Sequence, residues 1–114
     1  MLGRSTVSLP LYKKLNVLFR IEPGCLGPDG IDHVEEFCAY AKKSVAQLDS
    51  GYIRWVITPR YDKTLPEMEY KVRNKSLSQE RASQYLASLD KNLDEFEENL
   101  QEKLAELIDE YLGR

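Results

Sequence analysis

Cys25 and His33 are the residues of this chain best suited by type to nucleophilic chemistry. They stand eight positions apart around the expected start of a helix, and His33 is the only histidine. A helix N-terminus stabilises a thiolate, and a nearby imidazole is a suitable base for it. The carboxylates of Glu22 and Asp29 raise the pKa expected for the Cys25 thiol, because negative charge disfavours a thiolate. A thiol-dependent enzyme is therefore an alternative hypothesis, and we expect a chain without catalytic activity.

The segment 23–30 has a composition that invites comparison with phosphate-binding loops. It holds three glycines and two prolines, but no lysine or arginine, and its glycine spacing matches neither the dinucleotide nor the P-loop fingerprint. One cysteine and one histidine without a recognised spacing do not predict a metal site. The carboxylates of residues 95–110 lack the histidines of a metal-binding bundle. We expect no metal and no cofactor.

Basic residues gather on one face of the sheet that the apolar alternation predicts. Of thirteen residues assigned to this outer face by strand parity, seven are basic and one is acidic. The candidate binding residues are Tyr52, Arg54, Arg60, Lys71, Arg73 and Lys75. Such a face predicts a protein-interaction or regulatory module with an acidic protein partner. A single-stranded nucleic-acid module is the alternative, with Tyr52 as its stacking ring, although the net charge of −3 is low for that task.

The elements that position these residues follow from the apolar pattern. Alternation with period two predicts strands, at residues 15–21, 52–61 and 68–73. A turn at 62–66 joins the last two strands as a hairpin. Apolar residues stepping by three and four predict an intervening helix with Asp32 as its N-cap, which ends at 49–51.

The acidic segment 79–112 predicts one long C-terminal helix. At 1.5 Å per residue it would be about 50 Å long, whereas strands of nine residues reach roughly 30 Å. The overhang would leave an apolar stripe in water, which predicts a homodimer. The expected interface residues are Leu100, Leu104, Leu107, Ile108 and Tyr111. The alternative is a break near 88–92, with Asn92 and Glu95 capping a second segment that folds back.

The element order β-α-β-β-α predicts a single α+β domain over residues 1–114. We expect a three-stranded antiparallel sheet with two helices on one face, after a loosely ordered N-terminus at 1–10. The order resembles a truncated ferredoxin-like fold that lacks its final strand. This resemblance concerns topology and implies no function.

Composition places the chain among ordinary folded proteins, with 42% apolar and 31% charged residues. Residues 1–75 carry 12 basic and 9 acidic side chains, whereas residues 76–114 carry 4 and 10. This asymmetry predicts a C-terminal helix with an acidic solvated face, and the alternative is that the two parts attract each other, within or between chains. Two cysteines are too few for a disulfide framework and predict a reducing compartment. No apolar run is long enough for a bilayer or typical of a signal peptide. We therefore expect a soluble cytoplasmic protein without a membrane partner.

Overall fold

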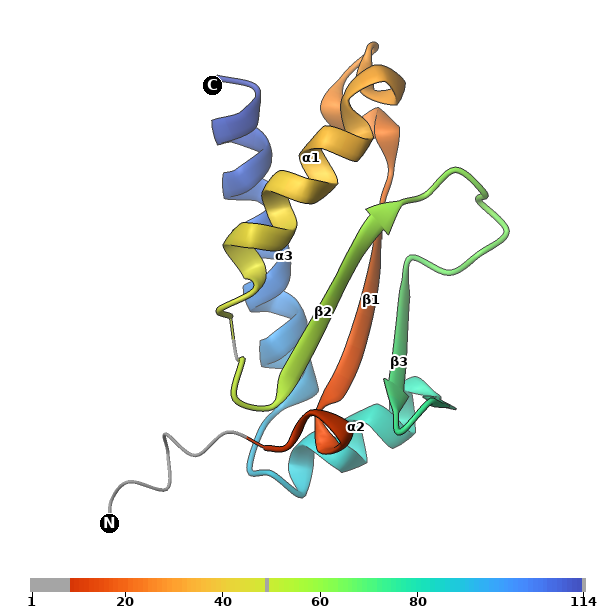
Figure 1. The fold of residues 1–114 in the computed structure, drawn as a ribbon, viewed down its shortest axis with the longest axis vertical. Helices are drawn as coiled ribbons and strands as arrows, with labels where there is room; N and C mark the ends of the chain where they lie inside the picture. The colour runs from red at the N-terminus through yellow and green to blue at the C-terminus, as the bar shows by residue number, and fades with distance from the viewer. Residues whose placement is uncertain (1–8, 49, 114) are drawn as a thin grey trace.

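The fold is α+β, with a four-stranded sheet, three α-helices and a long helix at the C-terminal end (Figure 1). The structure is a computed structural model that describes residues 9–48 and 50–113, so most of the N-terminus expected to be loosely ordered lies outside the described residues. The elements are η2 (Leu11–Lys13), β1 (Leu15–Ile21), η3 (Pro23–Leu26), α1 (Gly30–Val45), β2 (Ile53–Pro59), β3 (Met68–Val72), β4 (Lys75–Leu77), α2 (Gln79–Ala87) and α3 (Leu93–Tyr111). None of the described helices combines the length and the apolar character needed to span a bilayer.

The sheet is mixed, and its strand order is β2-β1-β3-β4. β1 pairs in parallel with β2 and antiparallel with β3, and β4 pairs antiparallel with β3. The prediction of three antiparallel strands was therefore wrong in strand number and in direction. The truncated ferredoxin-like arrangement with a β2–β3 hairpin is also wrong, because β1 lies between these two strands.

The long loop 60–67 explains why β2 and β3 do not form a hairpin. It crosses the end of β1 and brings the chain to the other side of that strand (Figure 1). Backbone bonds hold both ends of the loop to β1: Arg60 N–H donates to Ile21 O at 2.8 Å, and Arg20 N–H donates to Glu67 O at 2.8 Å. The predicted turn at 62–66 is present, since Leu65 N–H donates to Asp62 O at 3.2 Å, but it lies within a crossover and does not close a hairpin.

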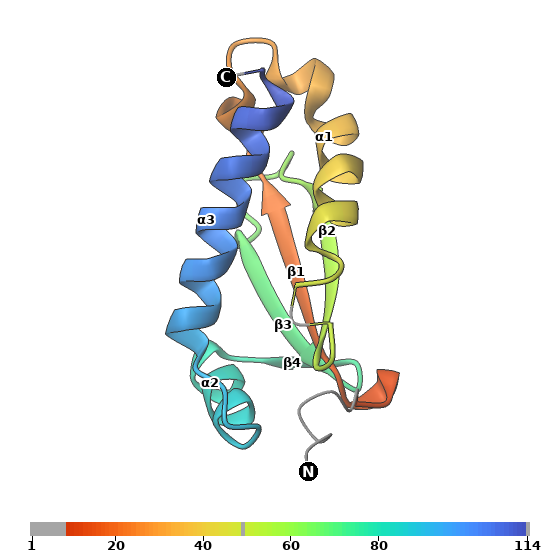
Figure 2. The same cartoon turned by 90° about the vertical axis from the view of Figure 1, so that its left-hand side faces the viewer.

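All three helices lie on one side of the sheet, as the views in Figures 1 and 2 agree. The residues of β1 that face them are buried, and they alternate with half-buried residues, as the period-two pattern predicts. Trp55 of β2 is buried in this core and contacts both a helix and a loop. Its indole stacks on Phe96 of α3 with ring centroids 5.2 Å apart, and its Nε1–H donates to Leu48 O at 2.8 Å.

The helix predicted after the glycine-rich loop is α1, but both of its ends differ from the expectation. It begins at Gly30, so the N-cap is Asp29 and not Asp32, and it ends at Val45 instead of at 49–51. Gly30 packs directly against the preceding turn. A Cβ placed on Gly30 would lie 1.7 Å from the carbonyl oxygen of Pro23, so this close approach requires glycine.

The segment 79–112 is not one helix, and the alternative of a break near 88–92 is confirmed. Ser78 caps α2 by accepting from Arg81 N–H at 3.1 Å, and Asn92 caps α3 by accepting from Glu95 N–H at 3.0 Å. Between them Asp90 adopts a φ of 61°, and Lys91 N–H donates to Leu86 O at 2.8 Å. This left-handed residue with a backward bond is a Schellman-type ending, which turns the chain without glycine.

Candidate functional site

The predicted outer face of the sheet is less cationic than its sequence suggests. Arg20 forms an ion pair with Glu69 at 2.5 Å. Arg60 pairs with Glu22 at 3.0 Å, and its guanidinium also donates to the carbonyl oxygen of Leu65 at 2.9 Å. These two arginines hold the crossover loop and neutralise nearby carboxylates. They are therefore committed to the fold, and Arg60 is poorly placed to bind a partner.

Arg54 and Lys71 remain on the outer face, one on each side of Asn16. The Arg54 guanidinium donates to the Asn16 side chain at 3.4 Å, and both basic side chains are exposed. Tyr52, the expected aromatic anchor, packs partly buried against the core instead. The Lys91 ammonium lies 5.1 Å from the centroid of the Tyr52 ring, so that ring is not an open stacking platform.

Arg73 and Lys75 lie elsewhere than strand parity predicts. Arg73 and Asn74 have φ values of 53° and 65°, so they are the two central residues of a tight hairpin turn between β3 and β4. Lys75 pairs with Val72 and faces the helix side of the sheet. Strand parity missed this turn because the alternation of the strand predicted at 68–73 was continued to Lys75, although asparagine is the residue most tolerant of a left-handed conformation after glycine.

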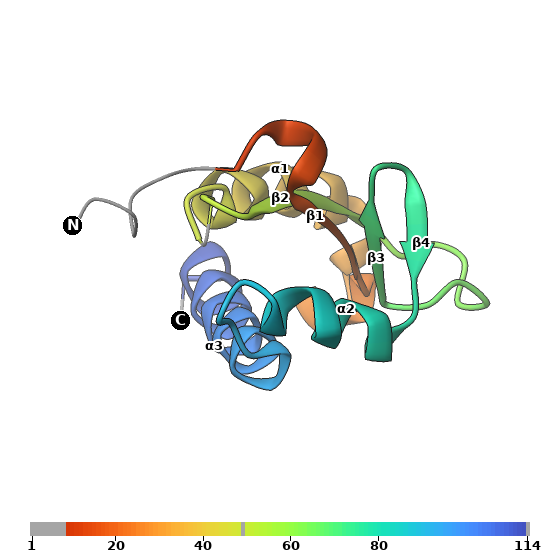
Figure 3. The ribbon, with the colours of Figure 1, turned by 90° about the horizontal axis from the view of Figure 1, so that it is seen from below.

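The β3–β4 hairpin, α2 and η2 lie at the end of the molecule that faces the viewer in Figure 3, and their residues line a basic groove. Its volume is about 840 Å³, within the range typical of ligand sites. Its cations are Lys13, Arg73, Lys75 and Arg81, and its one carboxylate is Glu80. Val72, Leu77 and Tyr85 supply apolar surface, so the groove joins positive charge with a hydrophobic lining.

Three contacts fix the shape of this basic groove. The Tyr85 hydroxyl of α2 donates to the backbone carbonyl of Lys13, which ties α2 to η2. The Arg73 guanidinium lies 5.4 Å from the centroid of the Tyr12 ring, and the Lys13 ammonium lies 5.8 Å from it. Tyr12 itself is 59% exposed. Lys13 and Arg73 are thus positioned by an aromatic ring, and all four groove cations are exposed to solvent.

A second groove, of about 720 Å³, is acidic. It lies between the start of β3 and α3, and its lining residues are Glu67, Met68, Asp94, Glu97, Glu98, Gln101 and Glu102. The five carboxylates of this lining have no lysine or arginine among them, and they would suit a divalent cation if their oxygens met at one point. Within residues 9–48 and 50–113, however, no group of three or more acidic, histidine or cysteine side chains is arranged to hold a metal.

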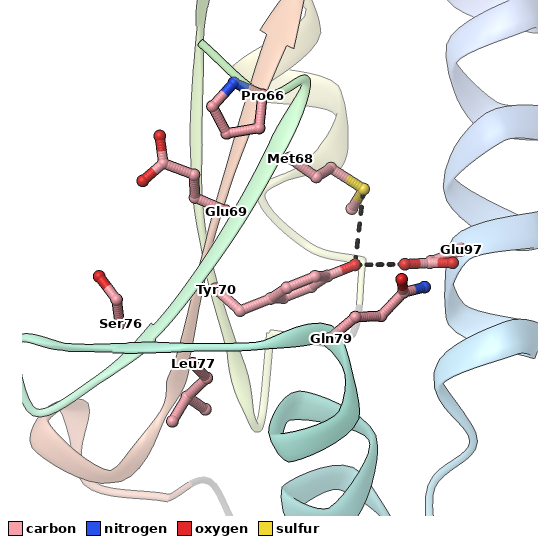
Figure 4. Close-up of a pocket in the computed structure, with 8 residues that line it drawn as sticks. All are labelled: Pro66, Met68, Glu69, Tyr70, Ser76, Leu77, Gln79 and Glu97. Carbon is pink, nitrogen blue, oxygen red and sulfur yellow. Dashed lines mark hydrogen bonds between the residues drawn. The ribbon is translucent and has the colours of Figure 1, made fainter.

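Tyr70 and Glu97 meet in a small pocket of about 290 Å³ beside the acidic groove (Figure 4). The Tyr70 side chain points from β3 toward α3, and its hydroxyl donates to the Glu97 carboxylate. Burial, and then the hydrogen bond and charge of Glu97, raise the pKa of Tyr70. The phenol therefore stays protonated near neutral pH. The Tyr70 hydroxyl links β3 to α3 through this hydrogen bond, and it is not suited to act as a general base.

Cys25 lacks the environment of a nucleophile. Burial, and then the charges of Glu22 and Glu67, raise the pKa of its thiol. His33 is exposed on α1, and no hydrogen bond links it to Cys25 in the part of the chain that the structure describes. The other cysteine, Cys38, is buried, and burial raises its pKa to about 11.

We expect Cys25 to react with iodoacetamide at neutral pH no faster than glutathione does, because a raised pKa leaves less thiolate than in a free thiol. Alkylation followed by mass spectrometry of the two cysteine peptides measures the rate at each site. Cys38 serves as the internal control and should react more slowly still, since its side chain is buried. A rate at Cys25 well above that of glutathione would restore the thiol-enzyme hypothesis.

The residues expected at a dimer interface lie instead within the single chain. Leu100, Leu104 and Leu107 are buried in the core, and Ile108 and Tyr111 pack against it. Because α3 folds back along the sheet, the uncovered stripe that predicted the homodimer does not exist. Two tyrosines close this end of the helix layer: Tyr40 of α1 donates to Glu110 at 2.6 Å, and Tyr111 of α3 donates to Glu36.

Comparison of the chain with protein-family models, curated proteins and solved structures found no match. The functional inference therefore depends on the two charged grooves and on the chemistry of the residues that line them.

Proposed function

We propose that this protein is a non-enzymatic interaction or regulatory module whose basic groove binds an acidic segment of a protein. The observation that carries the proposal is the gathering of four cations around an apolar floor, in a groove of about 840 Å³. Ligand sites combine an apolar lining with a few polar groups that fix orientation. Two cysteines that are not joined by a disulfide support a cytoplasmic location.

Within residues 9–48 and 50–113, the groove cations form no ion pair. Arg20–Glu69 and Arg60–Glu22 are ion pairs of the described residues, and neither involves a groove residue. A partner carboxylate would therefore meet cations that need not first break another ion pair. Among the described residues that line the groove, Glu80 is the only one with a carboxylate. Positive charge beside an apolar lining favours the binding of an amphipathic segment that has an acidic face and an apolar face.

A protein ligand suits the groove better than single-stranded nucleic acid. Nucleic-acid modules of that kind stack bases on exposed aromatic rings. Here the Tyr12 ring has the guanidinium of Arg73 and the ammonium of Lys13 beside it, and Tyr52 has Lys91. A base would have to displace these cations before it could stack. Removing cations from the rings would weaken the electrostatic attraction that a nucleic acid requires.

Reversing Arg73 and Lys75 to glutamate is expected to abolish capture of acidic proteins from a lysate. The double substitution turns the hairpin side of the groove negative and should weaken binding at least about 30-fold, since like charges in an interface cost several kcal/mol. Immobilised wild-type and variant proteins are compared by mass spectrometry of the captured proteins. Far-ultraviolet circular dichroism checks that the variant is folded.

The matched control is the double substitution Lys43→Glu and Lys63→Glu. It changes the net charge by the same amount, but these exposed lysines lie on α1 and on the crossover loop, away from the groove. The control should capture the same acidic proteins as the wild type. Equal loss in both double variants, or unchanged capture by the groove variant, would show that the groove is not the binding site.

A further inference from the structure

The α3 helix carries a dense negative charge on its solvent side. Eight of its nineteen residues are acidic and one is basic. Asp94, Glu98 and Glu102 follow one another at intervals of four, so they form one exposed row along the helix, about 12 Å in length. This row, called the acidic stripe below, lines one wall of the acidic groove.

The acidic stripe and the basic groove do not meet within the chain. In the described part of the molecule, Asp94, Glu98 and Glu102 form no ion pair, and neither do Lys13, Arg73, Lys75 and Arg81. The chain thus holds two surfaces of opposite charge, each of which leaves its charges to solvent. Charges arranged in this way on one molecule attract a second molecule of the same kind.

We propose that the basic groove of one copy binds the acidic stripe of a second copy, and that the contact is reciprocal. This inference rests on the proposed function, because it names the acidic segment that the groove binds. The stripe offers a row of three carboxylates to a groove with four cations. A closed pair with twofold symmetry uses both surfaces of each copy and leaves no free end for further growth.

The contact depends on charge, and the ionic strength therefore controls it. At about 20 mM salt the Debye length exceeds 20 Å, whereas at 1 M it falls to about 3 Å. We expect light scattering after size exclusion to give twice the 13.2 kDa mass of the chain at low salt and the mass of one chain at 1 M salt. A single-chain mass at low salt would overturn the proposal, as would a dimer that 1 M salt leaves intact.

Two charge-reversed proteins test the pairing itself. In the first, Arg73→Glu and Lys75→Glu make the groove negative; in the second, Glu98→Lys and Glu102→Lys make the stripe positive. Each protein alone should be monomeric at low salt, because its groove and stripe now repel each other between copies. An equimolar mixture should dimerise, because each variant groove faces a stripe of opposite charge. Loss of the dimer in both single proteins without its return in the mixture would contradict the proposed contact.

The Lys43→Glu and Lys63→Glu protein is again the control, and it should dimerise like the wild type. These measurements use purified protein, so they are independent of capture from a lysate. If the wild type is monomeric and still captures acidic proteins through the groove, the proposed self-association is wrong and the proposed function stands. A dimer with the expected charge dependence and no captured protein would restrict the groove to self-association.

Discussion

Replacing Trp55 by alanine is expected to lower the free energy of unfolding by about 3–5 kcal/mol. The residue is 5% exposed and lies where the sheet meets α3. Alanine would remove the stacking of Trp55 on Phe96 and leave a cavity between β2 and α3. It would also leave the carbonyl oxygen of Leu48 without the Nε1–H donor, which adds the cost of an unsatisfied polar group.

Urea titration followed by far-ultraviolet circular dichroism measures this loss, because Trp55 is the only tryptophan and its fluorescence disappears with it. The matched control is Trp55→Phe, which keeps a ring beside Phe96 but not the hydrogen bond to Leu48. It should lose roughly 1–2 kcal/mol. If both variants unfold at the same urea concentration, the stack on Phe96 does not stabilise the fold as described.

Gly30→Ala is expected to cost at least about 2 kcal/mol, which is the effect of forcing a methyl group into an already packed site. The new Cβ would lie 1.7 Å from the Pro23 carbonyl oxygen and 3.3 Å from the Cβ of Leu26. The first of these neighbours is backbone, so the whole turn before α1 would have to move. Thermal unfolding should show a fall in Tm of roughly 10 °C.

Gly24 lies in the same loop and provides the control for this prediction. A Cβ on Gly24 would meet no atom within 4 Å, and its φ is not in the left-handed region. Gly24→Ala should therefore change stability by less than about 1 kcal/mol, with a small gain expected from the stiffer unfolded chain. A Tm for Gly30→Ala close to that of Gly24→Ala would show that the contact with Pro23 is not needed.

The sequence predicts the individual elements better than their pairing. The alternation in 15–21 identifies β1 correctly, because its buried face consists of large apolar residues. The same pattern carries no information on which strand lies next to it. Leu18 is an apolar residue on the outer face, and the structure places it beside Val56 of β2.

The break in the last helix was predicted only as an alternative, since residues 88–92 contain neither glycine nor proline. Asp90 adopts the left-handed conformation that usually belongs to glycine, and Asn92 starts the next helix. Strand parity could not predict the basic groove, because parity assigns residues only to the two faces of a sheet. Its cations come from η2, the β3–β4 turn and α2, and only the folded chain brings Lys13 near Arg81.

The central place of β1 in the sheet also has a consequence during synthesis of the protein. β1 pairs with residues 53–59 on one side and with residues 68–71 on the other. As the chain leaves the ribosome, the apolar strand Leu15–Ile21 is made first among the described strands, yet its second neighbour follows about fifty residues later. Until then one edge of this strand has no partner, and an unpaired apolar edge favours association with other incomplete chains before the fold is formed.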